Sequence, residues 1–470
     1  MESAVRSNSR SATQLLRFRG ASDAGDPAEA RPLATARARR PGLALEPQRR
    51  VARRLTMLVA TIFAAAMSSG VVAGGASPAA FNGMAPEQAR LQVEGPSFQG
   101  TVAPTGTKRA ESVVWWNDGS WWADMWDAHS QDFHIFRFSA SAHRWMDTKT
   151  AVDRRDNTGA DALWDGAHLY IATHKRVRDM ERAVGGSASY LFRFSYSHSK
   201  HRYTLDDGFP TAINHYRTET LVIDEDTTGR LWATWQQDSA IYVASMPANS
   251  RTWRPPFRLP FPQAAVTVDD VSSVVAFSGR IGLLWSNQAA GEDGFWFSIH
   301  RVGASEKTWE PPEAALAGGR EADDHINLKA DSRGVVYAAV KTSNIHSNPL
   351  LLLLSRDLAG RWSSAIYGTA PFCHNRPTLV IDERRRLVHM FATGPAPPKY
   401  TCTTRGGAIY EKSTPADGSS FRPGRGGMVL DDANDPLLHN ASTSKRNVPT
   451  RAGLLLLAIN DQTQHYWTLH

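Results

Sequence analysis

The chain has 470 residues, of which 41% are hydrophobic and 21% are charged, so most of it can bury a core. Its formal net charge is +7, but about a dozen arginines fall within the first 54 residues and the remainder is near balanced. No basic stripe follows in the rest of the sequence, so a nucleic-acid partner is not expected.

The first 80 residues are predicted to be a basic extension and a secretory signal rather than part of the fold. Residues 1–54 are rich in Arg, Ala and Ser, and a short apolar stretch begins at Met57. That stretch is broken by Ser and Gly and ends in small residues with A-x-A-like spacing, which is the order of a signal peptide. We therefore expect a protein that is secreted or periplasmic through a signal at about residues 50–80. The alternative is an uncleaved signal that anchors the chain in a membrane, and Met57 is an alternative start.

The most informative pattern is a repeated unit that is clearest at residues 213–235, INHYRTETLVIDEDTTGRLWATW. It consists of a polar cluster, an apolar strand, a turn and a second strand. The pattern returns at residues 371–393 with TLVID unchanged, and more loosely at 269–285 and 323–341. A strand-rich unit that recurs about every 50–60 residues predicts the blades of a β-propeller. The 15 tryptophans agree with this, because propeller blades pack against one another through aromatic side chains.

Seven blades are predicted, so the fold class is all-β. Residues 1–80 form the extension and signal, 81–108 the closing strand and linker, and 109–470 the propeller. The last blade has only three strands of its own, and a strand within residues 91–103 completes it and removes its exposed edge. Six blades are the alternative, if the first unit and the tail merge. The predicted blades span residues 109–150, 155–208, 213–260, 266–315, 320–369, 373–430 and 437–470.

Polar residues are predicted to gather at the mouth, the end of the central channel at which each innermost strand begins. Residues just before the first strand of each blade lie there, and so do the ends of the second strands. Their residue types suit an acidic sugar, because Arg binds carboxylates, Trp stacks on sugar rings and Asp binds hydroxyl groups. The alternative is that they only link the blades through buried polar networks. The mouth candidates are His215, Tyr216, Arg217, Asp269, Asp270, Asp323, Asp324, His325, Lys329, His374, Arg376, Arg446, Trp235 and Trp285.

Cleavage of an acidic polysaccharide by β-elimination is the first hypothesis. The reaction needs a cation to neutralise the uronate carboxylate, a base to remove the proton on C5 and an acid for the leaving oxygen. Arg217 and Arg376 are the candidates for the carboxylate. The candidates for base and acid are His215, Tyr216, His325 and His374.

Two further functions remain open at this stage. Glycoside hydrolysis needs two carboxylates that flank the bond, and Asp270 and Asp324 occupy equivalent positions in adjacent blades. The same paired Asp residues are also suited to Ca²⁺, although no cofactor is expected and no CxxC or HExxH metal motif occurs. A monomeric, non-catalytic glycan-binding module that uses the same Arg and Trp residues is the other alternative.

The two cysteines of the chain are predicted to lie close together. Cys373 precedes the first strand of the sixth blade, and Cys402 lies in the connection between its second and third strands. Both positions belong to the mouth side of that blade, and an exported chain with an even cysteine count favours a disulfide bond. Two free thiols are the alternative.

The segments NHYRTETLVID, ADDHINLK and CHNRPTLVID resemble the sialidase-like (BNR-type) β-propeller superfamily, and most of all its exported bacterial polysaccharide lyases. The resemblance covers residues 85–470. The chain is not similar to true sialidases, because SASAHRW, ANSRTW and ASEKTW lack the Asp and Gly of the S-x-D-x-G-x-T-W box. The lyases imply a His/Tyr acid–base pair and a carboxylate-neutralising Arg. The residues that match this requirement by type and expected position are His215, Tyr216, Arg217, His325, His374 and Arg376.

Overall fold

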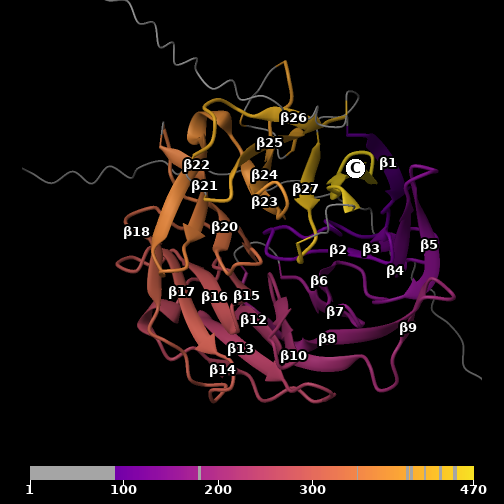
Figure 1. Ribbon diagram of the computed structural model, residues 1–470, viewed down its shortest axis with the longest axis horizontal. Helices are drawn as coiled ribbons and strands as arrows, with labels where there is room; N and C mark the ends of the chain where they lie inside the picture. The colour runs from indigo at the N-terminus through magenta and orange to yellow at the C-terminus, as the bar shows by residue number, and fades with distance from the viewer. Residues whose placement is uncertain are drawn as a thin grey trace, which may run out of the picture. The chain divides into compact units, whose positions relative to one another are not determined.

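The computed structural model describes residues 90–470 apart from 178–180, 347, 399–401, 403–405, 418–419, 433–436 and 448–451. The described residues form seven antiparallel sheets that follow one another around a ring (Figure 1). The protein is therefore a seven-bladed β-propeller, as predicted, and the six-bladed alternative is wrong. No helix among these residues is long and apolar enough to span a membrane. The predicted extension and signal lie outside the described residues.

Each sheet is one blade, and its first strand lies nearest the axis (Figure 1). Blades one to four consist, in order, of β2 Val114–Asn117, β3 Ser120–Asp127, β4 Asp132–Ser139 and β5 Arg144–Ala151; β6 Thr158–Trp164, β7 His168–Lys175, β8 Val184–Ser197, β9 Arg202–Leu205 and β10 Thr211–Arg217; β11 Val222–Glu225, β12 Leu231–Gln237, β13 Ala240–Met246 and β14 Phe257–Arg258; and β15 Ser272–Phe277, β16 Arg280–Asn287, β17 Gly294–Arg301 and β18 Glu313–Ala317.

The remaining blades are built in the same way. They consist of β19 Ile326–Ala330, β20 Val336–Lys341, β21 Pro349–Arg356 and β22 Trp362–Thr369; β23 Asn375–Asp382, β24 Leu387–Gly394, β25 Ala408–Pro415 and β26 Gly427–Leu430; and β27 Leu438–Ser442, β28 Leu456–Asn460, β29 His465–Leu469 and β1 Gln92–Ser97. Short 3-10 helices lie at Pro262–Ala264 and Ala370–Phe372.

The hydrophobic core lies between neighbouring blades. Inner strands are covered on both faces, and all seven residues of β12 are buried, whereas outer strands such as β22 alternate between buried and exposed residues. Trp122, Trp232 and Trp285 are among the largest fully buried side chains. The high tryptophan content therefore reflects packing between the blades.

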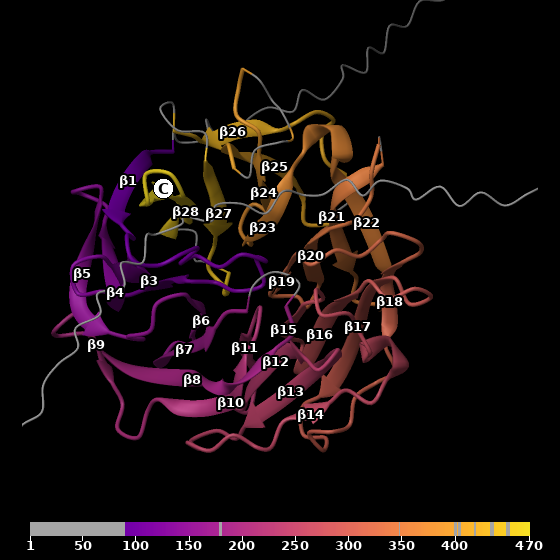
Figure 2. The same ribbon diagram turned by 180° about the vertical axis from the view of Figure 1, so that it is seen from behind.

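The N-terminal strand closes the ring (Figures 1 and 2). Strand β1 pairs antiparallel with β29, with Gln92 opposite Leu469 and Val93 opposite Thr468. This strand belongs to the last blade, although it comes first in the sequence. The predicted closure is confirmed, and it covers the edge of β29 that an open ring leaves unpaired.

Blade two differs from the prediction because it has five strands rather than four. Strand β8 is 14 residues long and pairs with β9 near one end and with β10 near the other. Residues 213–217 belong to β10, so the prediction that they are part of blade three is wrong. That first strand, β11, begins at Val222. The polar character of β10 reflects its place at the edge of a blade, with His215 exposed.

We predict that Val93→Pro weakens the ring closure. Leu91 and His470 exchange both backbone hydrogen bonds. In an antiparallel pair of strands every second residue pair does so, and therefore the N–H of Val93 bonds to Thr468. Proline removes that N–H, and we expect the free energy of unfolding to fall by about 1–3 kcal/mol. Urea unfolding measures the change, with Val93→Ala as the control for the lost side chain. Equal stability of the two variants would show that the closing ladder contributes little.

Candidate functional site

The central channel is filled at the mouth by residues 105–111, which cross it after leaving β1. The Lys108 carbonyl accepts a hydrogen bond from the Ile326 N–H of blade five. Asn327 donates its side-chain N–H to the Arg109 carbonyl at 2.7 Å, and Arg109 donates to the Ala441 carbonyl of blade seven at 2.6 Å. These contacts bond the segment to blades five and seven at the mouth side of the ring.

Glu111 ties the same segment to blades two and three. Its carboxylate contacts Nε2 of His174 at 2.5 Å and accepts a hydrogen bond from the Leu221 N–H at 3.1 Å. Burial opposes ionisation of this carboxyl, but His174 and Arg176 stabilise the charged form, so the pKa of Glu111 is lowered. The carboxylate is therefore ionised at neutral pH.

Arg109 carries a buried positive charge at the centre of the ring. Its guanidinium donates to the carbonyls of Thr105 and Ala441, and its relative exposure is 2%. Burial and the nearby Arg376 lower the pKa of Arg109 to about 9. The group is still protonated at pH 7, so it keeps this charge beneath the mouth.

Three carboxylates from adjacent blades meet around Lys108. The Lys108 ammonium forms an ion pair with Asp324 and lies 3.2 Å from Oε1 of Glu219. One oxygen each of Glu219, Asp269 and Asp324 lies within 4.8 Å of the others. These residues lie before the first strands of blades three, four and five. Such an all-oxygen set is of the kind that Ca²⁺ prefers, although Lys108 already offsets part of its charge.

His325 lies beside this cluster as a neutral side chain. Its Nδ1 atom lies 2.5 Å from Asp324 and 3.2 Å from Asp323. Burial lowers the pKa of His325 to about 3, although the hydrogen bond to Asp323 opposes the shift. Asp323 also forms an ion pair with Lys341 at 2.7 Å, which holds its pKa below the usual range despite burial.

The accessible candidates lie next to one another on β10. His215 is exposed, and Tyr216 and Arg217 are half-buried. Arg217 donates from Nε and Nη2 to the Arg176 carbonyl at 3.2 and 2.9 Å. Because β10 ends just before Thr218 and Glu219, the three side chains lie along the edge of blade two that leads to the mouth.

Arg376, Asp270 and Asp324 lie closer to the axis. Arg376 is half-buried in β23, and Asp324 belongs to the carboxylate cluster. Asp270 is fully buried and accepts hydrogen bonds from Ser286 and from the Thr267 N–H. Burial raises the pKa of Asp270 to about 6. It is therefore Asp269, one residue earlier, that joins Asp324 at the mouth.

His374, Trp235 and Trp285 lie inside the blades rather than on the mouth surface. His374 packs against the rings of Tyr367 and Tyr410, and burial, Arg425 and Lys412 lower its pKa to about 3. Both tryptophans have a relative exposure of 0%, so neither presents a ring face to solvent.

Lys329 and Arg446 lie farther along the channel. Lys329 is buried and donates to the Ser444 carbonyl, and burial together with Lys445 lowers its pKa to about 7. The prediction that Arg446 precedes the first strand of blade seven is wrong, because that strand spans Leu438–Ser442. Arg446 instead follows this strand and pairs with Asp224 of β11 at 2.9 Å.

Lys108 and Arg109 are site residues that the sequence did not reveal. Both fall at the boundary between the predicted linker and the propeller. The Pro/Gly/Thr-rich stretch there is typical of a linker and does not indicate a buried site residue. Two adjacent basic residues followed by Glu111 are the available signal. That signal is weak without knowledge of the ring, because the partners come from four blades.

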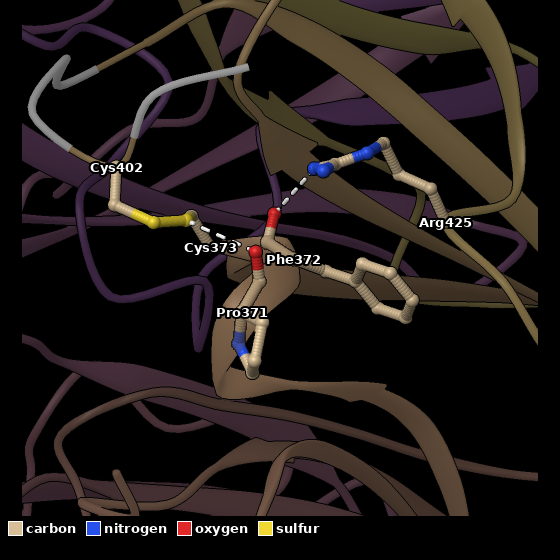
Figure 3. The surroundings of a disulfide bond; sticks show 5 residues. All are labelled: Pro371, Phe372, Cys373, Cys402 and Arg425. Carbon is tan, nitrogen blue, oxygen red and sulfur yellow. Dashed lines mark hydrogen bonds between the residues drawn. A yellow bond between two sulfur atoms is a disulfide. The ribbon is translucent and has the colours of Figure 1, made fainter. Parts of the chain in front are cut away.

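The predicted disulfide is confirmed (Figure 3). Cys373 and Cys402 are bonded, with their Cα atoms 5.2 Å apart. Cys373 follows the short helix Ala370–Phe372, and Arg425 donates to the Phe372 carbonyl at 2.6 Å. The bond fixes the connection between β24 and β25 to the start of blade six.

No family model matches the chain, and no curated protein matches it. Among solved structures, an ulvan lyase of polysaccharide lyase family PL25 is similar, with 11% identity over 81% of this chain and 96% of that chain and a TM-score of 0.53. A protein of unknown function from Dyadobacter fermentans has 10% identity over 67% and 93% of the two chains, with a TM-score of 0.41. The Penicillium chrysogenum α-L-arabinanase has 9% identity over 70% and 98%, with a TM-score of 0.40. The first likeness shows a shared propeller fold, and the BNR-type classification is not confirmed.

We predict that Lys108→Met destabilises the protein by about 3–5 kcal/mol, because it removes the ammonium group from between two buried carboxylates. Denaturant unfolding at pH 7 measures the loss. Lys307→Met, at an exposed position between β17 and β18, is the matched control and should change stability by less than about 0.5 kcal/mol. The double variant Lys108→Met/Asp324→Asn should be more stable than the single one. A single variant as stable as the control would contradict this role of Lys108.

We predict that His374 makes the protein less stable in mild acid. The histidine takes up a proton in the unfolded chain below a pH of about 6.5, but in the folded protein only below a pH of about 3. Between these limits the unfolded state binds more protons, so stability falls by about 1.4 kcal/mol per pH unit for this residue. His374→Asn should reduce that slope in urea unfolding between pH 7 and pH 4.5, whereas His129→Asn, at an exposed turn, should leave it unchanged. An unchanged slope in His374→Asn would contradict the assignment.

Proposed function

We propose that the mouth side of this propeller binds an acidic polysaccharide and cleaves it by β-elimination. The observation that carries the proposal is the position of His215, Tyr216 and Arg217 on β10. His215 is exposed and Tyr216 and Arg217 are half-buried, at the end of β10 from which the chain continues to Glu219 of the mouth. Their chemistry matches what the elimination of a uronate requires.

The roles follow from the chemistry of each side chain. Arg217 neutralises the uronate carboxylate and so acidifies the proton on C5. Its Nε and Nη2 groups are held by the Arg176 carbonyl, which orients the guanidinium, and Nη1 has no hydrogen-bond partner among the described residues. His215 removes the C5 proton, and Tyr216 donates a proton to the leaving oxygen.

Supporting residues extend the same surface toward the axis. Arg376 and the buried Arg109 add positive charge near the mouth, which favours a polyanion over a neutral glycan. His325 and His374 take no part in the proposed reaction, because both are buried and neutral at pH 7.

Two further observations support the choice of substrate class and compartment. The propeller fold is shared with an ulvan lyase over 96% of that chain. The bond between Cys373 and Cys402 is typical of a protein that folds in an oxidising compartment, so we propose that the protein acts as an exported monomer.

Glycoside hydrolysis is the second candidate, and the carboxylate cluster favours it. Glu219, Asp269 and Asp324 come from three adjacent blades and lie within 4.8 Å of one another. Retaining glycosidases place two carboxyl groups about 5–5.5 Å apart. Asp269 replaces Asp270 in this alternative, because Asp270 is buried and bonded to Ser286.

The test follows absorbance at about 235 nm, where the unsaturated product of β-elimination absorbs, during incubation with a panel of uronate polysaccharides. We expect a rise with at least one substrate, reduced by at least about 100-fold in His215→Ala and in Arg217→Ala. His198→Ala, at the exposed turn between β8 and β9 that lies away from the mouth, is the control and should keep full activity.

A flat trace with every substrate would contradict the lyase. A reducing-sugar assay on the same mixtures then separates the two remaining functions. Sugar release that is lost in Asp324→Asn identifies the hydrolase. Retained binding without release identifies a non-catalytic glycan-binding protein.

A further inference from the structure

A large cavity lies at the end of the ring opposite the mouth. Its volume is about 1280 Å³, and its lining residues come from blades six, seven and one. These three blades are consecutive around the ring (Figures 1 and 2). The lining comes from the turns that join β2 to β3, β4 to β5 and β23 to β24, and from residues 452–454. First-to-second and third-to-fourth strand turns lie away from the mouth, because successive strands of a blade run in opposite directions.

Residues that follow β27 in blade seven bond to other blades. After β27 the chain runs into the channel, where Lys445 pairs with Asp161 of blade two at 2.8 Å. Asn447 donates to the Ala330 carbonyl of blade five at 2.7 Å. Residues 444–447 therefore contact blades two, three and five.

Basic side chains outnumber acidic ones in the cavity lining. Four arginines and three histidines face one acidic side chain, Asp382, among the described lining residues. Asp382 lies 3.7 Å from Arg385, so its charge is offset within the cavity. The basic lining residues are Arg90, Arg137, Arg384, Arg385, His143, His389 and His470.

Two of these arginines have no carboxylate partner among the described residues. Arg137, on β4 of blade one, donates to the Ser120 hydroxyl at 3.1 Å. Arg384 is exposed on the turn between β23 and β24 of blade six. The cavity therefore presents two guanidinium groups on separate blades, and both suit carboxylate or sulfate oxygens.

Apolar side chains lie between these charges. Trp116 is half-buried and packs edge-to-face against Trp121, with their ring centroids 5.5 Å apart. Met146 and Leu91 have relative exposures of 37% and 41%, which is high for apolar side chains in a cavity wall. An indole beside guanidinium groups can stack on a sugar ring while its acidic substituents are bound.

We propose that this cavity binds a segment of an acidic oligosaccharide. It would thus anchor a second part of the substrate polymer on the face opposite the mouth. Arg137 and Arg384 bind the acidic groups, and Trp116 packs against a ring. The volume exceeds the range of about 300–1,000 Å³ that encloses a small molecule, which favours several linked sugars over a single anion. The inference rests on the substrate class of the proposed function but not on its chemistry.

The test measures binding by isothermal titration calorimetry in the His215→Ala/Arg217→Ala protein, whose β10 site is disabled. The probes are a galacturonate hexamer, dextran sulfate and, as a neutral control, maltohexaose. We expect the acidic probes to bind and maltohexaose not to bind. Arg384→Glu should weaken acidic binding by about tenfold or more, with a steep dependence on salt. Arg254→Glu is the matched control. It reverses the charge of an exposed arginine outside the cavity lining, so it should leave binding unchanged.

Three results would overturn the inference. The first is that neither acidic probe binds below about 1 mM. The second is binding that Arg384→Glu and Trp116→Ala leave intact, and the third is Arg384-dependent binding of duplex DNA in place of both acidic saccharides. Failure of the proposed function is distinguishable from these. If absorbance stays flat while Arg384-dependent binding persists, the lyase is refuted and the far-face site stands. The reverse pattern refutes this site alone.

Discussion

The rest of the structure depends on the packing of residues 105–111 into the central channel. Seven inner strands leave a gap at the axis, and backbone groups beside it need partners that neighbouring blades cannot reach. The crossing segment supplies them, because Lys108, Arg109 and Glu111 bond to blades two, three, five and seven. The same contacts place the segment across the axis on the mouth side of the ring.

A second connection fills the other end of the channel. Lys445 and Arg446 bind carboxylates of blades two and three, and Lys329 donates to the Ser444 carbonyl. The basic side chains that enter from both ends meet acidic groups that the inner strands supply. Because the channel is packed from both ends, the mouth and the far face are separate surfaces, and each must be assigned its own chemistry.

The seven blades, the closing strand and the disulfide could be predicted because each depends on a pattern within one or two segments. TLVID recurs at equivalent positions in β11 and β23, and Cys373 and Cys402 belong to one blade. The site could be predicted only in part. Residues 213–217 resemble a loop because an edge strand can carry polar side chains as freely as a turn does. The sequence predicts His374 and Trp235 at the surface, because residue type alone does not show whether a ring faces solvent or a neighbouring blade.

Charge is distributed differently on the two ends of the ring, and this separates their proposed roles. At the mouth, lysine side chains already form ion pairs with carboxylates of the protein. Lys108 pairs with Glu219 and Asp324, and Lys341 pairs with Asp323. Arg217 instead donates to the Arg176 carbonyl and bonds to no carboxylate among the described residues, so under our proposal it supplies the main attraction for a polyanion at the mouth. In the far cavity, Arg137 and Arg384 have no carboxylate partner among the described residues, so under our proposal this cavity adds attraction for the same polymer. Affinity for an acidic polymer and the chemistry performed on it can thus reside on different faces, and weakening one need not weaken the other.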